Sequence, residues 1–185
     1  FATAYNFIIL AGNFETLFVG WEFLGITSFL LIGFYRDRYL PVKNALKTIS
    51  LYRLGDICLM LALWTSHHIW NENITFAKLE NAELVTSHIA GNYASVIFLI
   101  SMIIIAASIK SAQFPFSSWL PRAMEGPTTS SAVFYGSLSV HLGVFLLMRT
   151  HNYWESIGLI KMIIIIMGVC TAVVATSIAR VQSTV

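Results

Sequence analysis

Charged residues are scarce in this chain. They make up 11% of its 185 residues, whereas hydrophobic residues make up 57%. The mean hydropathy of +0.74 is well above that of soluble globular proteins. Proline occurs only four times and cysteine twice, at Cys58 and Cys170, and both cysteines lie in apolar runs. This composition excludes an ordinary soluble domain and predicts a membrane protein with two buried free thiols.

Several function classes lack their sequence signatures here. The chain contains no glycine-rich phosphate loop, no cysteine cluster and no serine-nucleophile setting, so redox chemistry within it is not expected. The cysteines have no metal-ligand spacing, and neither a metal nor a cofactor is expected in the chain. Its basic residues are scattered rather than clustered with exposed aromatic residues, which argues against nucleic acid as a partner.

Long apolar runs dominate what is present. About 20 apolar residues cross a bilayer, so we expect an all-α, polytopic transmembrane helix bundle in a single domain. The chain begins at Phe1 without a methionine, and we therefore expect it to be a piece of a longer protein. The predicted spans are 1–11 (partial), 16–34, 44–64, 93–121 (broken), 129–148 and 157–179, with one extramembrane segment at 66–91.

Prolines interrupt the span at 93–121. Pro115 and Pro121 follow a long apolar run that ends at Lys110. Because proline removes a backbone donor and clashes with the preceding turn, we predict that the helix breaks near Gln113–Phe116. Broken backbone in a membrane persists only where protein or water surrounds it. Lys110 is therefore a candidate relay or ion-binding group, and the alternative is a lysine that snorkels from a helix end.

Other ionisable residues fall inside predicted spans. Glu22 lies in the span 16–34, and Lys47, Arg53 and Asp56 lie in the span 44–64. Burying a lone carboxylate in hydrocarbon costs at least about 2–3 kcal/mol, so Glu22 must face protein, water or a cation. Arg53 and Asp56 are three residues apart and can pair on one helix face. Such charges indicate a proton or ion pathway, and the alternative is a set of structural ties between helices.

A histidine also lies within a predicted span. His141 shares a helical stripe with Ser130, Phe134 and Ser137. Because histidine changes charge near neutral pH, His141 is a candidate proton relay, and the alternative is a hydrogen-bonded packing residue. The five tryptophans mostly flank predicted spans, which is typical of an interfacial aromatic belt.

Three motifs resemble those of a known family. Phe18–Gly33 reads FVGWEFLGITSFLLIG, Ala45–Asp56 reads ALKTISLYRLGD, and Lys110–Thr128 reads KSAQFPFSSWLPRAMEGPT. In this order and spacing they resemble the antiporter-like, proton-pumping subunits of respiratory complex I, the NADH:quinone oxidoreductase. The resemblance covers essentially the whole chain.

The resemblance implies a fold and a set of roles. The fold would be part of an inverted-repeat, antiporter-like bundle with a discontinuous helix. Glu22 and Lys110 would be the coupled pair of one proton half-channel, facing one another directly or through water. Lys47, Arg53 and Asp56 would be the polar neighbourhood of that pair, and His141 a supporting relay residue.

The resemblance also implies a setting. The chain would translocate protons in an energy-transducing membrane, with the bacterial cell membrane as the first expectation and the mitochondrial inner membrane as the second. Its partners would be other membrane subunits, the lipid bilayer and protons. NADH, flavin, iron–sulfur clusters and quinone would be bound only by partner subunits.

The chain departs from the family pattern in two places. After the broken helix it reads GPTTSSAVFY where the family has roughly GPTPVSALLH, so Tyr135 occupies the expected histidine position and His141 lies six residues later. Thr176–Arg180 reads TSIAR where the family usually has TDIKR. These departures keep a second function open: a subunit of a multisubunit cation/proton antiporter or of a cation-coupled inorganic-carbon uptake system. A membrane scaffold whose charges only lock helices together is the third.

Overall fold

The described chain is entirely helical apart from loops. A computed structural model describes residues 1–181, and for residues 133–135 it describes the backbone alone. Within these residues the only β feature is an isolated bridge between Asn13 and Thr75. The elements are α1 (Ala2–Ile9), α2 (Phe14–Ile32), α3 (Tyr39–Trp70), α4 (Phe76–Leu79), α5 (Ala82–Gly91), α6 (Tyr93–Lys110), η1 (Ser117–Trp119), η2 (Pro121–Glu125), α7 (Thr128–Ser130), the π-helix η3 (Ser131–Ser139), α8 (His141–Arg149), α9 (His151–Trp154) and α10 (Gly158–Val181).

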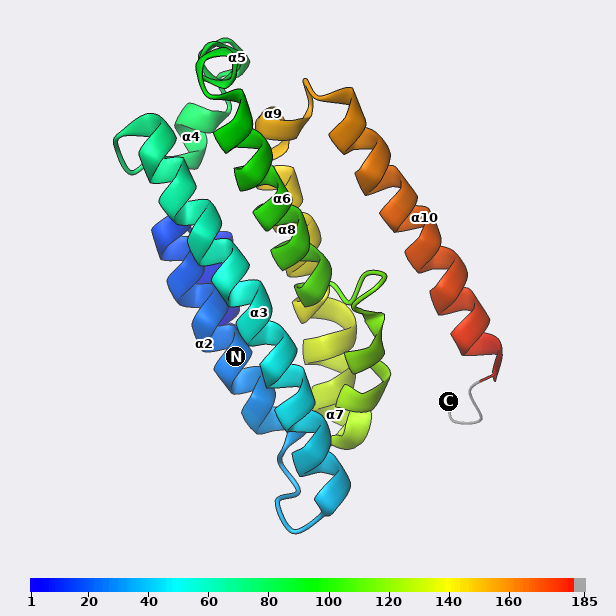
Figure 1. Cartoon of the computed structure of the whole chain (residues 1–185). Coiled ribbons are helices and arrows are strands. Elements are labelled where there is room, and N and C mark those ends of the chain that lie inside the picture. The colour runs from blue at the N-terminus through cyan, green and yellow to red at the C-terminus, as the bar shows by residue number, and fades with distance from the viewer. Residues whose placement is uncertain (182–185) are drawn as a thin grey trace.

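The bundle is built around α6. Helix α3 packs along both α2 and α6, α6 also packs on α8, and α1 lies against α2 (Figure 1). Apolar side chains such as Leu99, Ile100 and Ile103 of α6 are fully or almost fully buried between these neighbours. Helix α10 stands apart from the others and contacts them mainly near α9 (Figure 1). The site described below therefore lies between α2, α3 and α6.

Among residues 1–181, three helices are long and apolar enough to cross a membrane: α2, α6 and α10. They lie where the spans 16–34, 93–121 and 157–179 are predicted. The span predicted at 44–64 is part of the longer helix α3, and the span predicted at 129–148 is divided among α7, η3 and α8. The polar segment 66–91 is largely helical, because α3 continues to Trp70 and the segment contains α4 and α5.

The predicted break in the membrane helix is present. Helix α6 ends at Lys110, and residues 111–116 are not helical. Ala112 has a φ of 51°, in the left-handed region that L-residues other than asparagine and aspartate rarely adopt. Pro115 lies in the middle of the non-helical segment, as its missing backbone donor requires.

Three side-chain hydrogen bonds fix the broken segment. The Trp119 indole nitrogen donates to the Ile109 carbonyl oxygen at 2.9 Å, next to the end of α6. The Ser111 hydroxyl donates to the Val140 carbonyl oxygen at 2.7 Å. The Phe114 amide donates to the Thr171 hydroxyl of α10 at 3.0 Å. The backbone groups at the break are thus partly satisfied by η1 and by α10, and the Ser111 side chain ties the segment to the start of α8.

A glycine sets the distance between α6 and α8. A Cβ atom at Gly143 would lie 2.2 Å from the Ser111 hydroxyl oxygen and 2.3 Å from the Ala107 carbonyl oxygen. No side chain fits there, so only glycine permits this approach of the two helices.

The burial of two tryptophans corrects the prediction of an interfacial aromatic belt. Trp21 and Trp119 are 1% and 0% exposed, so they are core residues and not members of an interfacial belt. Trp64 is 65% exposed, as the prediction requires. Buried indoles need a partner for their N–H group, and Trp119 finds one at the end of α6.

Candidate functional site

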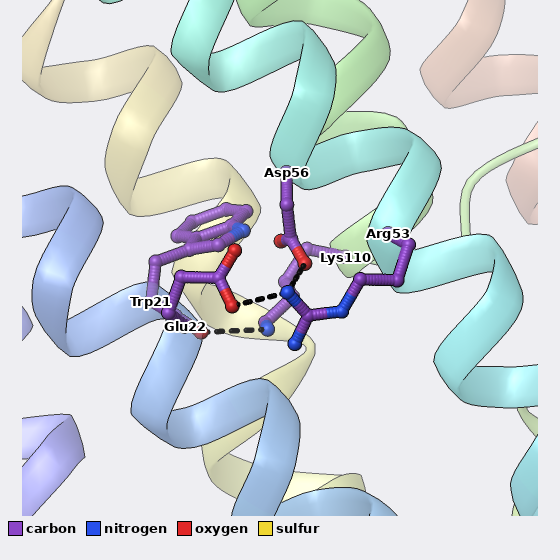
Figure 2. A network of polar contacts seen from close by, with 5 residues as sticks. All are labelled: Trp21, Glu22, Arg53, Asp56 and Lys110. Carbon is purple, nitrogen blue, oxygen red and sulfur yellow. Dashed lines mark hydrogen bonds and ion pairs between the residues drawn. The ribbon is translucent and has the colours of Figure 1, made fainter.

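Lys110 is buried at the end of α6. Its side chain is 1% exposed, which is exceptional for lysine and demands compensating contacts. The ammonium lies 4.2 Å from the centroid of the Tyr52 ring and 4.9 Å from that of the Trp21 ring. It also donates to the Trp21 carbonyl oxygen at 3.4 Å (Figure 2). Two aromatic faces and one carbonyl therefore stabilise the charge that burial makes costly.

Two carboxylates approach this lysine. Asp56 of α3 and Glu22 of α2 both extend toward Lys110 (Figure 2). Among the described residues, no carboxylate oxygen lies within the 4.0 Å of a direct ion pair with Lys110. The three side chains nevertheless converge on one point of the bundle (Figure 2). Their interaction is electrostatic over a short gap, not a salt bridge.

Arg53 joins the two carboxylates. One of its guanidinium nitrogens, Nη1, lies 2.5 Å from Glu22 Oε2 and 3.7 Å from Asp56 Oδ2 (Figure 2). The expected pairing of Arg53 with Asp56 along α3 is present, and Glu22 makes the closer contact. Exposure falls across the group, since the side chains of Arg53, Glu22 and Asp56 are 45%, 23% and 4% exposed. The cluster therefore runs from the outside of the bundle to the buried lysine.

Helical periodicity explains how α2 presents its part of the site. The helix is capped by Asn13, whose side chain accepts from the Thr16 amide at 2.9 Å. The buried face then carries Trp21 and Gly25, one turn apart. A Cβ at Gly25 would lie 3.7 Å from both the Lys110 ammonium and the Tyr52 ring. Glu22, adjacent to Trp21, falls at the edge of this face and can reach Arg53.

Helix α3 supplies the other wall. Tyr52 and Asp56 are four residues apart, so they lie on the same face of α3, and both are buried in the bundle where α3 packs on α6. Gly55 faces α6, where a Cβ would make an ordinary contact with the side chain of Ile109 at 3.4 Å. The Tyr52 ring also meets the Trp119 ring edge to face at 5.1 Å. Tyr52 thus connects the lysine with the segment that follows the helix break.

Two other candidate residues lie outside this group. Lys47 is partly buried on α3, and in the described part of the chain it forms no ion pair. His141 begins α8 with an exposed side chain, and Ser137 is exposed as well. The side chain of Tyr135, which occupies the family's histidine position, lies outside the described residues. The geometry therefore brings together Glu22, Arg53, Asp56 and Lys110.

Sequence reasoning missed the aromatic residues around Lys110. Trp21 and Tyr52 directly precede Glu22 and Arg53, and their proximity to charged residues was the available signal. Nowhere among residues 1–181 do three or more His, Cys, Asp or Glu side chains converge as a metal site would require. Chemically, the arrangement can hold a proton on the lysine. The two carboxylates and the arginine can change how tightly that proton is held.

These features define a class of protein. Apolar helices of membrane length surround ionisable side chains beside a broken helix, which is the arrangement of membrane proteins that conduct protons or ions. A family model described as NADH:quinone oxidoreductase/Mrp antiporter, TM matches residues 11–185. The chain belongs to this family, and the prediction from its motifs is confirmed.

The names of two similar proteins agree with this family. The chain is 34% identical over 172 residues to NADH-ubiquinone oxidoreductase chain 5 of Yarrowia lipolytica, covering 93% of this chain and 25% of the relative. It is 34% identical over 184 residues to NADH-quinone oxidoreductase subunit L of Escherichia coli, covering 94% of this chain and 29% of the relative. The chain thus spans little more than a quarter of the length of these relatives.

A solved structure has the same fold. The Mrp complex from Dietzia sp. DQ12-45-1b matches with a TM-score of 0.69 and 29% sequence identity, over 78% of this chain and 15% of that chain. The match confirms a polytopic, antiporter-like helix bundle with a discontinuous helix. It also places the chain in a membrane.

Proposed function

We propose that this chain forms part of the proton pathway of an antiporter-like subunit of NADH:quinone oxidoreductase. One observation carries the proposal: Lys110 is fully buried beside a helix break and lies close to two carboxylates and an arginine. The relatives named chain 5 and subunit L support this setting. Oxidation of NADH and reduction of quinone, with their flavin and iron–sulfur clusters, would take place in partner subunits.

The mechanism uses Arg53 as a movable counter-charge. In the present arrangement Arg53 neutralises Glu22 and lies within 3.7 Å of Asp56 through the same nitrogen. A shift of the guanidinium toward Asp56 would leave Glu22 free to attract the Lys110 ammonium and hold its proton. The reverse shift would weaken that attraction and ease release of the proton. Lys47 would add to the positive field along α3, and His141 would act at a later step of the pathway.

Proton transport by the assembled complex tests the proposal. The complete complex is reconstituted in liposomes, and NADH-driven proton uptake is measured for Glu22→Gln and Lys110→Met. The matched controls are Glu72→Gln and Lys78→Met, which remove an exposed pair with a 2.7 Å contact. We expect the first two variants to lose most proton uptake while the complex stays assembled, and the controls to keep it. Wild-type uptake by both Glu22→Gln and Lys110→Met would refute the proposal.

A cation/proton antiporter is the second candidate function. The structural match to an Mrp complex favours it, as does the TSIAR sequence near the end of α10. A cation-coupled inorganic-carbon uptake system would use the same cluster. The antiporter and the NADH:quinone oxidoreductase subunit differ in their driving force, since an antiporter would exchange protons for sodium ions without NADH. Proton movement driven by a sodium gradient alone, with no NADH-oxidising subunit in the purified complex, would establish the antiporter.

A further inference from the structure

A groove opens between the end of α2 and the start of α3. It has a volume of about 460 Å³, within the range of about 300–1,000 Å³ that is usual for ligand sites. Its walls are Phe29, Leu30 and Gly33 from the α2 side and Val42, Ala45 and Leu46 from the α3 side. The only charged residue that lines it is Arg36, from the connection between the two helices.

The walls of the groove are apolar and accessible. Leu30 and Leu46 are 51% and 53% exposed, and Val42 is 37% exposed. Leu30 lies on α2, which is long and apolar enough to span a membrane, and Val42 and Leu46 lie beside it at the start of α3. Within a membrane such exposed aliphatic side chains can contact lipid hydrocarbon. The groove therefore suits an acyl chain that lies along the two helices.

The mouth of the groove is positively charged. Arg36 is exposed, and its guanidinium forms no ion pair with any residue the structure describes. Arg38, in the same connection, lies over the ring of Tyr35, and Lys43, near the start of α3, lies over the ring of Tyr39. Asp37 is the single acidic residue among them, so the mouth carries a net positive charge.

The position of this charge matches a membrane interface. The connection lies at one end of the bundle, where α2 ends and α3 begins (Figure 1). Exposed tyrosines beside arginine and lysine are typical of the headgroup region, and basic pockets between membrane helices bind anionic headgroups. We propose that this groove binds an anionic phospholipid, with the phosphate at Arg36 and one acyl chain between α2 and α3. This inference is independent of the proposed function.

Photo-crosslinking in the complete complex tests the site. The probes are phosphatidylglycerol and phosphatidylcholine, each with a photoreactive group in one acyl chain, and crosslinked peptides are located by mass spectrometry. We expect phosphatidylglycerol to label the peptides that contain Leu30 and Leu46, and phosphatidylcholine to label them much less. Arg36→Gln should reduce this labelling about fivefold, the change expected for one basic contact with an anionic headgroup. Arg36→Lys should retain most of it.

Further variants distinguish the effect of the Arg36 charge from that of the space in the groove. Leu46→Trp fills the groove without changing any charge and should also abolish labelling. Arg180→Gln removes an exposed arginine in the last turn of α10, outside the residues that line the groove, and is the matched control, with labelling unchanged. Assembly of each variant is checked by its subunit content. Inorganic phosphate at millimolar concentration should not compete, because the acyl chain supplies much of the affinity.

Three results would overturn the proposal. Equal labelling by the two probes, unaffected by Arg36→Gln, would mean that the groove only faces bulk lipid. Competition by inorganic phosphate would mean that Arg36 binds a free anion. Crosslinks from the groove to another protein segment, with no lipid labelling, would mean that a neighbouring helix occupies it.

Discussion

Glu22 directs its carboxylate to Arg53, 2.5 Å away, although the ammonium of Lys110 lies against the carbonyl of the preceding residue, Trp21. The expected partners Glu22 and Lys110 are therefore close without being paired directly. An arginine stands between two carboxylates and competes with the lysine for them. On the proposed mechanism the protonation state of Lys110 depends on where Arg53 lies, and this dependence can be tested.

Replacing Arg53 should impair proton uptake. In Arg53→Gln, Glu22 and Asp56 lose their shared cation, and both carboxylates act on Lys110, which then releases its proton less readily. We expect proton uptake to fall roughly tenfold, which corresponds to about 1.4 kcal/mol in the barrier. Arg53→Lys keeps the charge and should recover part of the rate. An assembled Arg53→Gln complex with wild-type proton uptake would contradict the role of Arg53.

Thr171 should hold the broken segment in place. Its hydroxyl accepts the hydrogen bond of the Phe114 amide at 3.0 Å, although α10 otherwise packs little on the bundle. Thr171→Val leaves that amide without its acceptor, at a cost of about 0.5–1.5 kcal/mol, the net contribution of a typical hydrogen bond. Hydrogen exchange measured by mass spectrometry should therefore become faster in the peptide that contains Phe114.

Thr176→Val is the matched control. Thr176 is on the same helix, and its hydroxyl donates to the Ala172 carbonyl oxygen of α10 itself at 2.7 Å. The exchange of the 111–116 segment should not change in this variant. Equal exchange in wild type and Thr171→Val would show that other contacts hold the segment.

Much of this arrangement could be predicted from the sequence. Pro115 in an apolar run predicts the helix break, because proline cannot donate to the helix. Asp56 and Arg53, three residues apart, predict a shared face on α3. The free-energy cost of burying a charge identifies Glu22 and Lys110 as candidate functional residues. Each of these signals is local, and each is found in the structure as a local feature.

The remaining features depend on packing between distant segments. Sequence patterns place Trp21 near the end of a span, but only the approach of α3 and α6 shows that its ring covers Lys110. The Glu22–Arg53 contact joins residues 31 apart, and no periodicity within one helix predicts it. His141 lies on a regular helical stripe in the sequence, whereas the π-helix η3 changes the phase of the residues before it.

Gly143 should be intolerant of a side chain. In Gly143→Ala the new methyl group would lie 2.2 Å from the Ser111 hydroxyl oxygen, so α8 must move away from α6. We expect a loss of about 1–3 kcal/mol in stability, as for other overpacked sites. The measurement is the thermal stability of the assembled complex. Gly168→Ala is the control, because nothing lies within 4 Å of a Cβ there. Equal stability of the two variants would mean that the helices separate without cost.

Tyr153 should stabilise the opposite end of the bundle. Its phenol is 2% exposed, accepts a hydrogen bond from the Trp70 indole at 2.7 Å, and lies 3.5 Å from the Ser66 hydroxyl. It thereby ties α9 to the end of α3. Tyr153→Phe leaves the Trp70 N–H group without its acceptor, and we expect a loss of about 1–3 kcal/mol in thermal stability. Tyr39→Phe, at a residue 74% exposed, is the control and should cost little.

The pH dependence gives a second test of Tyr153. Burial raises the pKa of its phenol above the ordinary value of about 10. A raised pKa in the folded state means that the neutral phenol contributes stability below pH 10, and that this contribution is lost as the pH rises through the folded value. The wild-type protein should therefore lose stability above pH 10. Tyr153→Phe lacks this loss, so the difference in stability between the two proteins should become smaller as the pH rises. A difference that stays constant up to pH 11 would contradict this account.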